Sequence, residues 1–403
     1  MLKKIISIFG TDSRMRKDLL SFVEFGFGYA LLLPLNLLLM RVVNRGLSPD
    51  EMGRFSFVTG LAAVVAPILY FSAPQAYIRF HDRYRIARSL RRFIMPFFWV
   101  SALGLALIVF RYTRSYFAAL YAFLPFFTEK TYLLRCRMKI TRMNLLQIGA
   151  AAVTLLLTFL WCRDRELNAG ILLGFYGIGY LTALFFRGGE LTDAPTDRRQ
   201  VIHFLWPTIF TTLLATFLAN SAVMFAKSFF GYESAGIMGV AAKAALVVNS
   251  FFSLFLMFFP LIYIREASTG SFRLIRLYRR SITAAALLVC AVIALLHKEI
   301  YHLLGADRYL DHSGLFVILI GVAFFNFIAD IYWLYFSIEI KTWKSSLLKA
   351  LSCVILLFGL FFAPAFGLRY LALLLLAAAA VPAIIGAIMA LRLERKRERK
   401  EQR

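Results

Sequence analysis

Four basic side chains lie inside or at the edge of long apolar runs, where charge is rarely tolerated. Lys243 stands among small residues in MGVAAKAALVVN, and Lys227 lies near the end of another apolar run. Arg41 precedes the polar stretch RGLSPDEMGRFSF, Arg45–Phe57, here called the corner segment, and Arg54 lies near its end. A charge at the bilayer centre costs at least about 2.5–3.5 kcal/mol, so each cation is a functional candidate. They predict an anionic ligand, with anchoring at the membrane interface as the alternative for Arg41, Arg54 and Lys243.

Two asparagines in the apolar runs could line a polar cavity together with these cations. Asn220 and Lys227 are seven residues apart and share one helix face. Aligning the first apolar run with the seventh pairs Asn36 with Asn220 and, with one residue deleted, Gly53 with Gly236. These polar residues could bind part of a ligand, or they could form hydrogen bonds between helices without contacting any ligand.

Three acidic residues also fall within the apolar runs, toward the expected cytoplasmic side. Glu24, Glu129 and Asp330 are candidates for binding a coupling proton or cation. A structural ion pair with a nearby Lys or Arg is the favoured interpretation.

Residue spacing gives little support for an enzyme or a metal site. The histidines form no HExxH motif, the four cysteines show no metal-ligand spacing, and no phosphate-binding loop is present, so we expect no metal and no cofactor. The stretch from Lys298 to Ser313 is the longest expected outer loop and contains His302, Asp307, Asp311 and His312. It leaves a membrane polysaccharide polymerase or ligase as a minor alternative.

The amino-acid composition predicts which kind of secondary structure carries these residues. The chain has 403 residues, 61% hydrophobic, with mean hydropathy +0.73, whereas soluble domains are about 45–50% apolar. Its apolar runs are near the 20 residues that a membrane-crossing helix needs, so we predict an all-α integral membrane protein. The expected spans, about twelve, are 18–43, 54–78, 93–110, 115–134, 144–162, 169–186, 201–226, 236–262, 280–297, 314–337, 345–363 and 370–391.

This count divides the chain into two similar parts. We expect a cytoplasmic N-terminal tail at 1–17, a six-helix half at 18–186, a cytoplasmic linker at 187–200, a second six-helix half at 201–391 and a basic cytoplasmic tail at 392–403. An even number of spans makes the two halves parallel, related by a pseudo-two-fold axis along the membrane normal, as in several transporters.

The formal net charge of +24 is explained by orientation in the membrane. With the N-terminus inside, the cytoplasmic segments carry 32 Lys and Arg residues and the outer segments carry 11. Both termini are therefore predicted to be cytoplasmic, where basic residues attract anionic membrane lipids. Nucleic acid is excluded as the reason for the charge.

The corner segment is expected to join the first two spans. Pro49 and Gly53 are suited to ending one helix and opening the next, and Ser48 or Asp50 is suited to capping the second.

The corner segment also carries a resemblance to a known family. LSPDEMGRFSF, then FSAPQAYIRFHDR, and later YHLLGADRYLDHSGLFVILIGVAFFNFI, Tyr301–Ile328, resemble polysaccharide repeat-unit flippases. These are the O-antigen, Wzx-type branch of the multidrug/oligosaccharidyl-lipid/polysaccharide (MOP) exporter superfamily.

The resemblance implies a carrier in the bacterial inner membrane that works by alternating access. Its cargo would be a polyprenyl-diphosphate-linked oligosaccharide, moved from the cytoplasmic to the outer leaflet for surface polymers such as the O-antigen of lipopolysaccharide. Other polysaccharide-assembly membrane proteins would be its partners. The main alternative is a multidrug or organic-cation exporter of the same superfamily, for which Glu24 would serve as the membrane-embedded acid.

Overall fold

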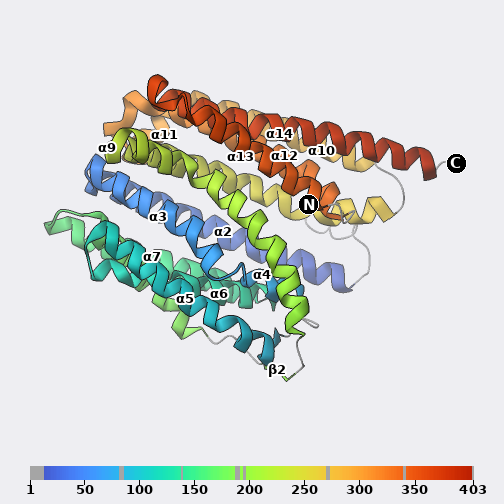
Figure 1. Cartoon of the computed structure of the whole chain (residues 1–403), viewed down its shortest axis with the longest axis horizontal. Helices are drawn as coiled ribbons and strands as arrows, with labels where there is room; N and C mark the ends of the chain where they lie inside the picture. Colours follow the sequence, from blue (N-terminus) through green and yellow to red (C-terminus); the bar gives the residue numbers. More distant parts are fainter. Residues whose placement is uncertain are drawn as a thin grey trace. The chain divides into compact units, whose positions relative to one another are not determined.

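The computed structural model describes residues 13–80, 86–137, 139–186, 191–193, 197–268, 273–338 and 342–401, and most of them are helical (Figure 1). The elements in chain order are α2 (Ser13–Gly46), α3 (Pro49–Leu69), α4 (Pro74–Arg79), β1 (Ile86–Ala87), α5 (Arg88–Thr113), η1 (Phe117–Phe123), α6 (Leu124–Cys136), α7 (Ile140–Asp164), α8 (Ala169–Leu181), η2 (Thr182–Phe185), β2 (Leu191–Thr192), α9 (Arg198–Ser268), α10 (Arg273–Leu295), α11 (His297–Leu303), η3 (Asp307–His312), α12 (Ser313–Ile338), α13 (Thr342–Leu360) and α14 (Ala363–Glu401).

Among the described residues, nine helical stretches are long and apolar enough to cross a membrane. This confirms the prediction of a multi-pass helical membrane protein. Two of the expected spans, 201–226 and 236–262, lie within α9 on either side of Gly231, where two helical stretches meet at a kink. Two others are interrupted: 115–134 covers η1 and most of α6, and 169–186 covers α8 and η2, where α6 and α8 have only 13 residues each. The expected number of twelve spans in two related halves therefore stays a prediction.

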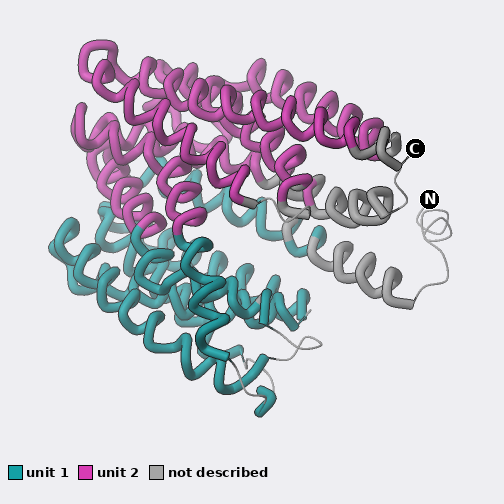
Figure 2. The backbone as a smooth tube through the Cα atoms, turned by 45° about the vertical axis from the view of Figure 1, so that its right-hand side comes forward, with its two compact units in different colours: residues 1–46, 65–209 teal, residues 47–64, 210–403 magenta. Residues whose placement is uncertain are grey.

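The chain packs into two compact units, which Figure 2 shows in different colours. Unit 1 contains Met1–Gly46 and Val65–Ile209, and a hydrophobic core cluster in it joins α4, α5 and α6 to the start of α9. Phe98 is fully buried there beside Tyr70, and a short parallel pairing of β1 with β2 lies at its edge.

Unit 2 contains Leu47–Val64 and Phe210–Arg403. Helix α12 packs along α14, and Thr211 on α9 lies within hydrogen-bonding distance of Ser346 on α13, at 3.2 Å. The first part of α3 thus packs with residues that follow 209, so packing does not divide the chain at the boundary expected between 18–186 and 201–391. The expected division into two six-helix halves rests on an internal repeat of the sequence rather than on packing, and it also stays a prediction.

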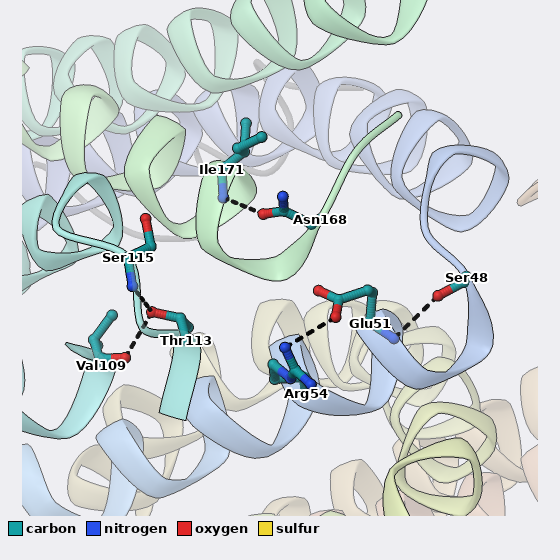
Figure 3. A network of polar contacts seen from close by, with 8 residues as sticks. All are labelled: Ser48, Glu51, Arg54, Val109, Thr113, Ser115, Asn168 and Ile171. Carbon is teal, nitrogen blue, oxygen red and sulfur yellow. Dashed lines mark hydrogen bonds and ion pairs between the residues drawn. The ribbon is translucent and has the colours of Figure 1, made fainter. Parts of the chain in front are cut away.

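Local capping explains where several helices begin and end. The Ser48 hydroxyl accepts a hydrogen bond from the Glu51 amide at 3.3 Å, so Ser48 is the predicted cap of α3 (Figure 3). Asn168 likewise caps α8 by accepting a bond from the Ile171 amide at 2.9 Å. Both caps supply partners for amides that the helix itself leaves free.

Candidate anion-binding site

Three of the four predicted cations lie along the contact between the first part of α3 and α9 in unit 2, Lys243 in one group of contacts and Lys227 with Arg54 in another. Lys243 on α9 donates a hydrogen bond from Nζ to the Ser56 hydroxyl on α3 at 3.1 Å. The same ammonium lies 3.9 Å from the centroid of the Phe55 ring. Two neighbouring residues of α3 therefore bind one lysine.

A second group of contacts surrounds Tyr232 on α9. The Lys227 ammonium lies 5.5 Å from the Tyr232 ring centroid and 5.1 Å from that of Phe57 on α3. The Arg54 guanidinium lies 5.5 Å from the same Tyr232 ring and forms an ion pair with Glu51 at 3.1 Å (Figure 3). The Tyr232 ring thus contacts both Lys227 and Arg54.

The two lysines have aromatic and hydroxyl partners rather than acidic ones among the described residues. Within the described part of the chain, no acidic side chain forms an ion pair with Lys243 or Lys227, whereas Arg54 pairs with Glu51. A cation over an aromatic ring gains about 0.5–1 kcal/mol when exposed and about 2 kcal/mol when desolvated. The rings therefore contribute attraction to the ammonium groups where no described acidic side chain pairs with them.

Glycines allow α3 and α9 to approach this closely. A Cβ added at Gly53 would lie 1.7 Å from the Tyr232 carbonyl oxygen, and one at Gly236 would lie 2.4 Å from the Pro49 oxygen. At Gly239 a Cβ would lie 2.3 Å from the Ser56 hydroxyl. The backbones touch directly, and the aligned pair Gly53 and Gly236 is part of this contact.

A bend in α9 brings its two lysines to the same partner helix. Gly231 has φ 89° and ψ −177°, a conformation that side chains with a Cβ rarely adopt. Lys227 precedes this residue and Lys243 follows it, and both contact the segment of α3 from Phe55 to Phe57. A straight helix α9 would not present both ammonium groups to three consecutive residues.

The two predicted asparagines, Asn220 and Asn36, belong to different units of the structure. Asn220 lies at the α3–α9 contact, since a Cβ at Gly60 of α3 would be 3.5 Å from its side-chain oxygen. Its amide nitrogen donates to the Thr216 carbonyl at 2.8 Å within α9. Asn36 is exposed on α2 and Arg41 is half-buried there, and both belong to unit 1. Their participation in the site stays a prediction.

The acidic candidates lie elsewhere. Glu129 is buried in unit 1, where it accepts hydrogen bonds from Arg91 Nε at 2.9 Å and from the Tyr77 hydroxyl at 3.3 Å. This arrangement supports the structural ion pair expected for Glu129. Asp330 is exposed on α12 and interacts electrostatically with Lys349 of α13. Glu24 belongs to α2, but its side chain is outside the described ones.

A buried ion pair in unit 2 escaped the sequence analysis. Arg279 on α10 and Glu394 on α14 are both 1% exposed, and Nη1 of the arginine donates to Oε2 of the glutamate at 2.9 Å. The guanidinium also lies 4.8 Å from the Tyr332 ring centroid. The partners are 115 residues apart, and Glu394 stands in the basic run LRLERKRERK, so no local pattern pairs them.

Two of the four residues of the minor enzyme alternative, His302 and Asp307, form a pair. His302 Nδ1 bonds to Asp307 Oδ1 at 2.5 Å, with both side chains substantially exposed. Among the described residues, no group of three or more His, Cys, Asp or Glu side chains could hold a metal ion.

Comparisons with known proteins identify the fold. No protein-family model matches this sequence, and no curated protein matches it. A solved MATE multidrug transporter, DinF-BH, aligns with 95% of this chain and 96% of its own, at 13% identity and TM-score 0.68. An inward-facing multidrug resistance MATE family transporter of the MOP superfamily aligns with 91% of this chain and 96% of its own, at 13% identity and TM-score 0.62.

Identity this low establishes fold alone. It does not single out the polysaccharide flippases within the superfamily, and the structural neighbours are transporters rather than enzymes. The chain has the multi-pass helical fold of the MATE transporters of the MOP superfamily.

Proposed function

We propose that this protein is a flippase that moves a polyprenyl-diphosphate-linked oligosaccharide across the bacterial inner membrane. The observation that carries the proposal is the pair of lysines, Lys243 and Lys227, held by aromatic rings of α3 and α9 without acidic partners among the described residues. The transporter fold supplies the general mechanism, in which access alternates between the two sides of the membrane.

The charge of the cluster favours an anionic cargo. Arg54, Lys227 and Lys243 outnumber Glu51, the one acid paired with them in the described structure. An ammonium donates up to three hydrogen bonds, and bonds to phosphate oxygens are strengthened by charge. The diphosphate would bind here, the sugar would occupy a hydrated space, and the isoprenoid tail would remain in lipid. Arg41 and Asn36 of unit 1 stay candidate ligands of the diphosphate or the sugar on the sequence alone.

Other parts of the proposal rest on the sequence. The excess of basic residues in alternate loops predicts that both termini are cytoplasmic and that anionic lipids bind at that face. A flippase of this kind supplies its cargo to polysaccharide-assembly proteins in the same membrane, which are its expected partners.

A multidrug or organic-cation exporter is the second candidate. The fold neighbours described above are multidrug transporters, and the exposed Asp330 could attract a cation or bind a coupling proton. The lysine pair opposes a cationic cargo because like charges repel. Sensitivity of cells lacking the protein to cationic dyes, with surface polysaccharide intact, would establish the exporter instead.

The test of the flippase uses cells that lack this protein. We expect loss of surface polysaccharide and accumulation of one completed lipid-linked repeat unit in the inner leaflet, detected by extraction and mass spectrometry. Normal polymer without accumulation, in cells shown to contain no second carrier, would overturn the proposal.

Complementation then tests the site. Lys243→Gln should reduce export about 10- to 100-fold, because a hydrogen bond to a charged group contributes about 1.5–3 kcal/mol. Lys298→Gln, an exposed lysine on α11, is the matched control and should restore export fully. Equal export by the two variants, at equal protein levels, would remove Lys243 from the site.

A further inference from the structure

The chain passes between the two compact units at three points. The first, after Gly46, is the turn that joins α2 to α3. The second, after Val64, lies inside α3, and the third, after Ile209, lies inside α9. A hinge consists of a few residues that absorb a change in φ and ψ, so movement of one unit on the other must be absorbed at these three points.

A proline lies close to each of the two crossings that occur inside a helix. Pro67 cannot donate the helical hydrogen bond to the carbonyl of Ala63, so the weakened turn of α3 includes the crossing itself. Pro207 likewise cannot donate to the carbonyl of His203, and it lies two residues before the crossing in α9. Sharp bends of helices occur mostly at such positions. Both helices are therefore able to bend where they pass from one unit to the other.

The described part of the linker before α9 is fastened to unit 1. Strand β2 pairs with β1, and Arg88 forms an ion pair with Asp193 at 3.3 Å. The Arg198 guanidinium lies 5.8 Å from the centroid of the Phe93 ring on α5. These contacts hold the start of α9 in unit 1, which includes this helix up to Ile209. The bending point then lies within α9 rather than in the polar linker.

A strained turn fixes the end of α3 in the same unit. Phe71 has φ 57° and Ser72 has φ 46°, a left-handed conformation that is unfavourable for residues with a Cβ. Such strain persists only where the surroundings hold it, and it collects in switch regions. The Ser72 amide donates to the Pro67 carbonyl at 2.8 Å, and the Phe71 ring stacks on Phe97 of α5 with 5.6 Å between centroids. The turn is thus tied both to the proline and to α5.

The same turn joins the two proline segments to each other. The centroid of the Phe71 ring lies 6.0 Å from that of Trp206, the residue before Pro207. Phe71 follows Pro67 by four residues, about one helical turn. One ring contact within unit 1 therefore connects the bending point of α3 to that of α9.

We propose that Pro67 and Pro207 form a paired hinge, about which α3 and α9 bend together when unit 2 moves on unit 1. The turn at Phe71 and Ser72, with the contact of Phe71 to Trp206, is the fixed side of this hinge. The turn after Gly46 absorbs the movement at the remaining crossing. The proposal needs only the transporter fold and is independent of the nature of the cargo.

Distances between spin labels measure this movement. In a variant whose four native cysteines are replaced by alanine, Asp164→Cys at the end of α7 and Asp311→Cys in η3 place one label on each unit, and both residues are exposed. The protein is reconstituted in lipid nanodiscs, and double electron–electron resonance gives the distribution of distances. We expect this parent variant to have a broad distribution with more than one distance.

Proline variants test the hinge. The double variant Pro67→Ala, Pro207→Ala restores both helical hydrogen bonds, so the distribution should narrow to about half its width. Pro96→Ala is the matched control, because Pro96 lies within α5, which belongs entirely to unit 1, and it should leave the width unchanged. A single narrow distribution in the parent, or equal widths in the parent and the double variant, would overturn the hinge.

Tryptophan variants test the fixed side. Trp206→Leu removes the ring contact with Phe71 and should broaden the distribution, whereas Trp99→Leu removes a ring contact with Phe126 elsewhere in unit 1 and should leave it unchanged. Equal effects of these two variants would overturn the role of the Phe71 contact.

Export by the double proline variant tests whether the hinge serves transport. Export should fall as the distribution narrows, and a narrowed distribution with full export would overturn that role. The distance measurement needs no cargo, so failure of the flippase assignment and failure of the hinge are distinguished.

Discussion

At the scale of single residues, the partner of each buried charge determines its role. Lys243 donates a hydrogen bond to a hydroxyl and contacts an aromatic ring. Glu129 accepts hydrogen bonds from an arginine and a tyrosine, and Arg279 forms a bidentate ion pair with Glu394. A buried charge that is already paired is stabilised by its protein partner and has little free capacity for a ligand. This difference separates the candidate site from the structural ion pairs.

The ion pair of Arg279 with Glu394 should contribute strongly to stability only as a pair. Arg279→Met removes the guanidinium that binds both carboxylate oxygens of the buried Glu394, so we expect a loss of about 3–5 kcal/mol in the free energy of unfolding. The double variant Arg279→Met, Glu394→Met should recover most of that loss. Thermal unfolding in detergent measures both, with the exposed Arg280→Met as control. Equal losses in the single and double variants would contradict a coupled pair.

Glu129 is expected to act in folding rather than in coupling. Glu129→Gln keeps the shape of the side chain but removes the charge that pairs with Arg91. We predict a lower melting temperature in detergent, with transport per folded molecule and its dependence on pH unchanged. If the melting temperature stayed constant while transport lost its dependence on pH, Glu129 would be a coupling residue instead.

At the scale of elements, small residues set the distance between helices. Gly177 on α8 faces η1 so closely that a Cβ would lie 2.2 Å from the Leu120 carbonyl carbon. Gly149 on α7 has nothing within 4 Å of the same added atom. One glycine therefore allows close packing, and the other contributes no contact of that kind.

These two glycines form a matched test of packing. Gly177→Ala must push α8 away from η1, and we expect a loss of about 1–3 kcal/mol in the free energy of unfolding, as for overpacking in general. Gly149→Ala should be neutral or stabilising by about 0.5–1 kcal/mol, because alanine favours the helix. Unfolding of both variants in the same detergent gives the comparison, and similar values would contradict the close contact of α8 with η1.

At the scale of the whole molecule, the distribution of basic residues predicts its orientation. Asp311 lies in η3, in the expected outer loop, and Arg392 lies near the end of α14, in the expected cytoplasmic tail; both are exposed. In a cysteine-free variant, Asp311→Cys should react with an impermeant maleimide in intact cells. Arg392→Cys should react only after the membrane is permeabilised. The reverse pattern would invert the topology and contradict the assignment of the cytoplasmic side.

The sequence by itself determined the class of the protein. Long apolar runs require helices in a membrane, because a helix satisfies its own backbone hydrogen bonds there. The sequence also predicted the polar corner segment and offered Ser48, with Asp50 as the alternative, as the cap of α3. A cap depends on residues three positions apart, so it leaves a local pattern. Lys243, Lys227 and Arg54 stood out because charge in an apolar run is costly.

Only the tertiary structure decided which of these residues meet. Lys243 and Ser56 are 187 residues apart, and Arg279 and Glu394 are 115 apart, so neither pairing leaves a local pattern in the chain. The same holds for the glycine contact of α3 with α9, where the fit of two backbones matters rather than the spacing along either one. Local spacing fixes helices and caps because these depend on neighbouring residues, whereas the ligands of a cation depend on which distant helix packs against it.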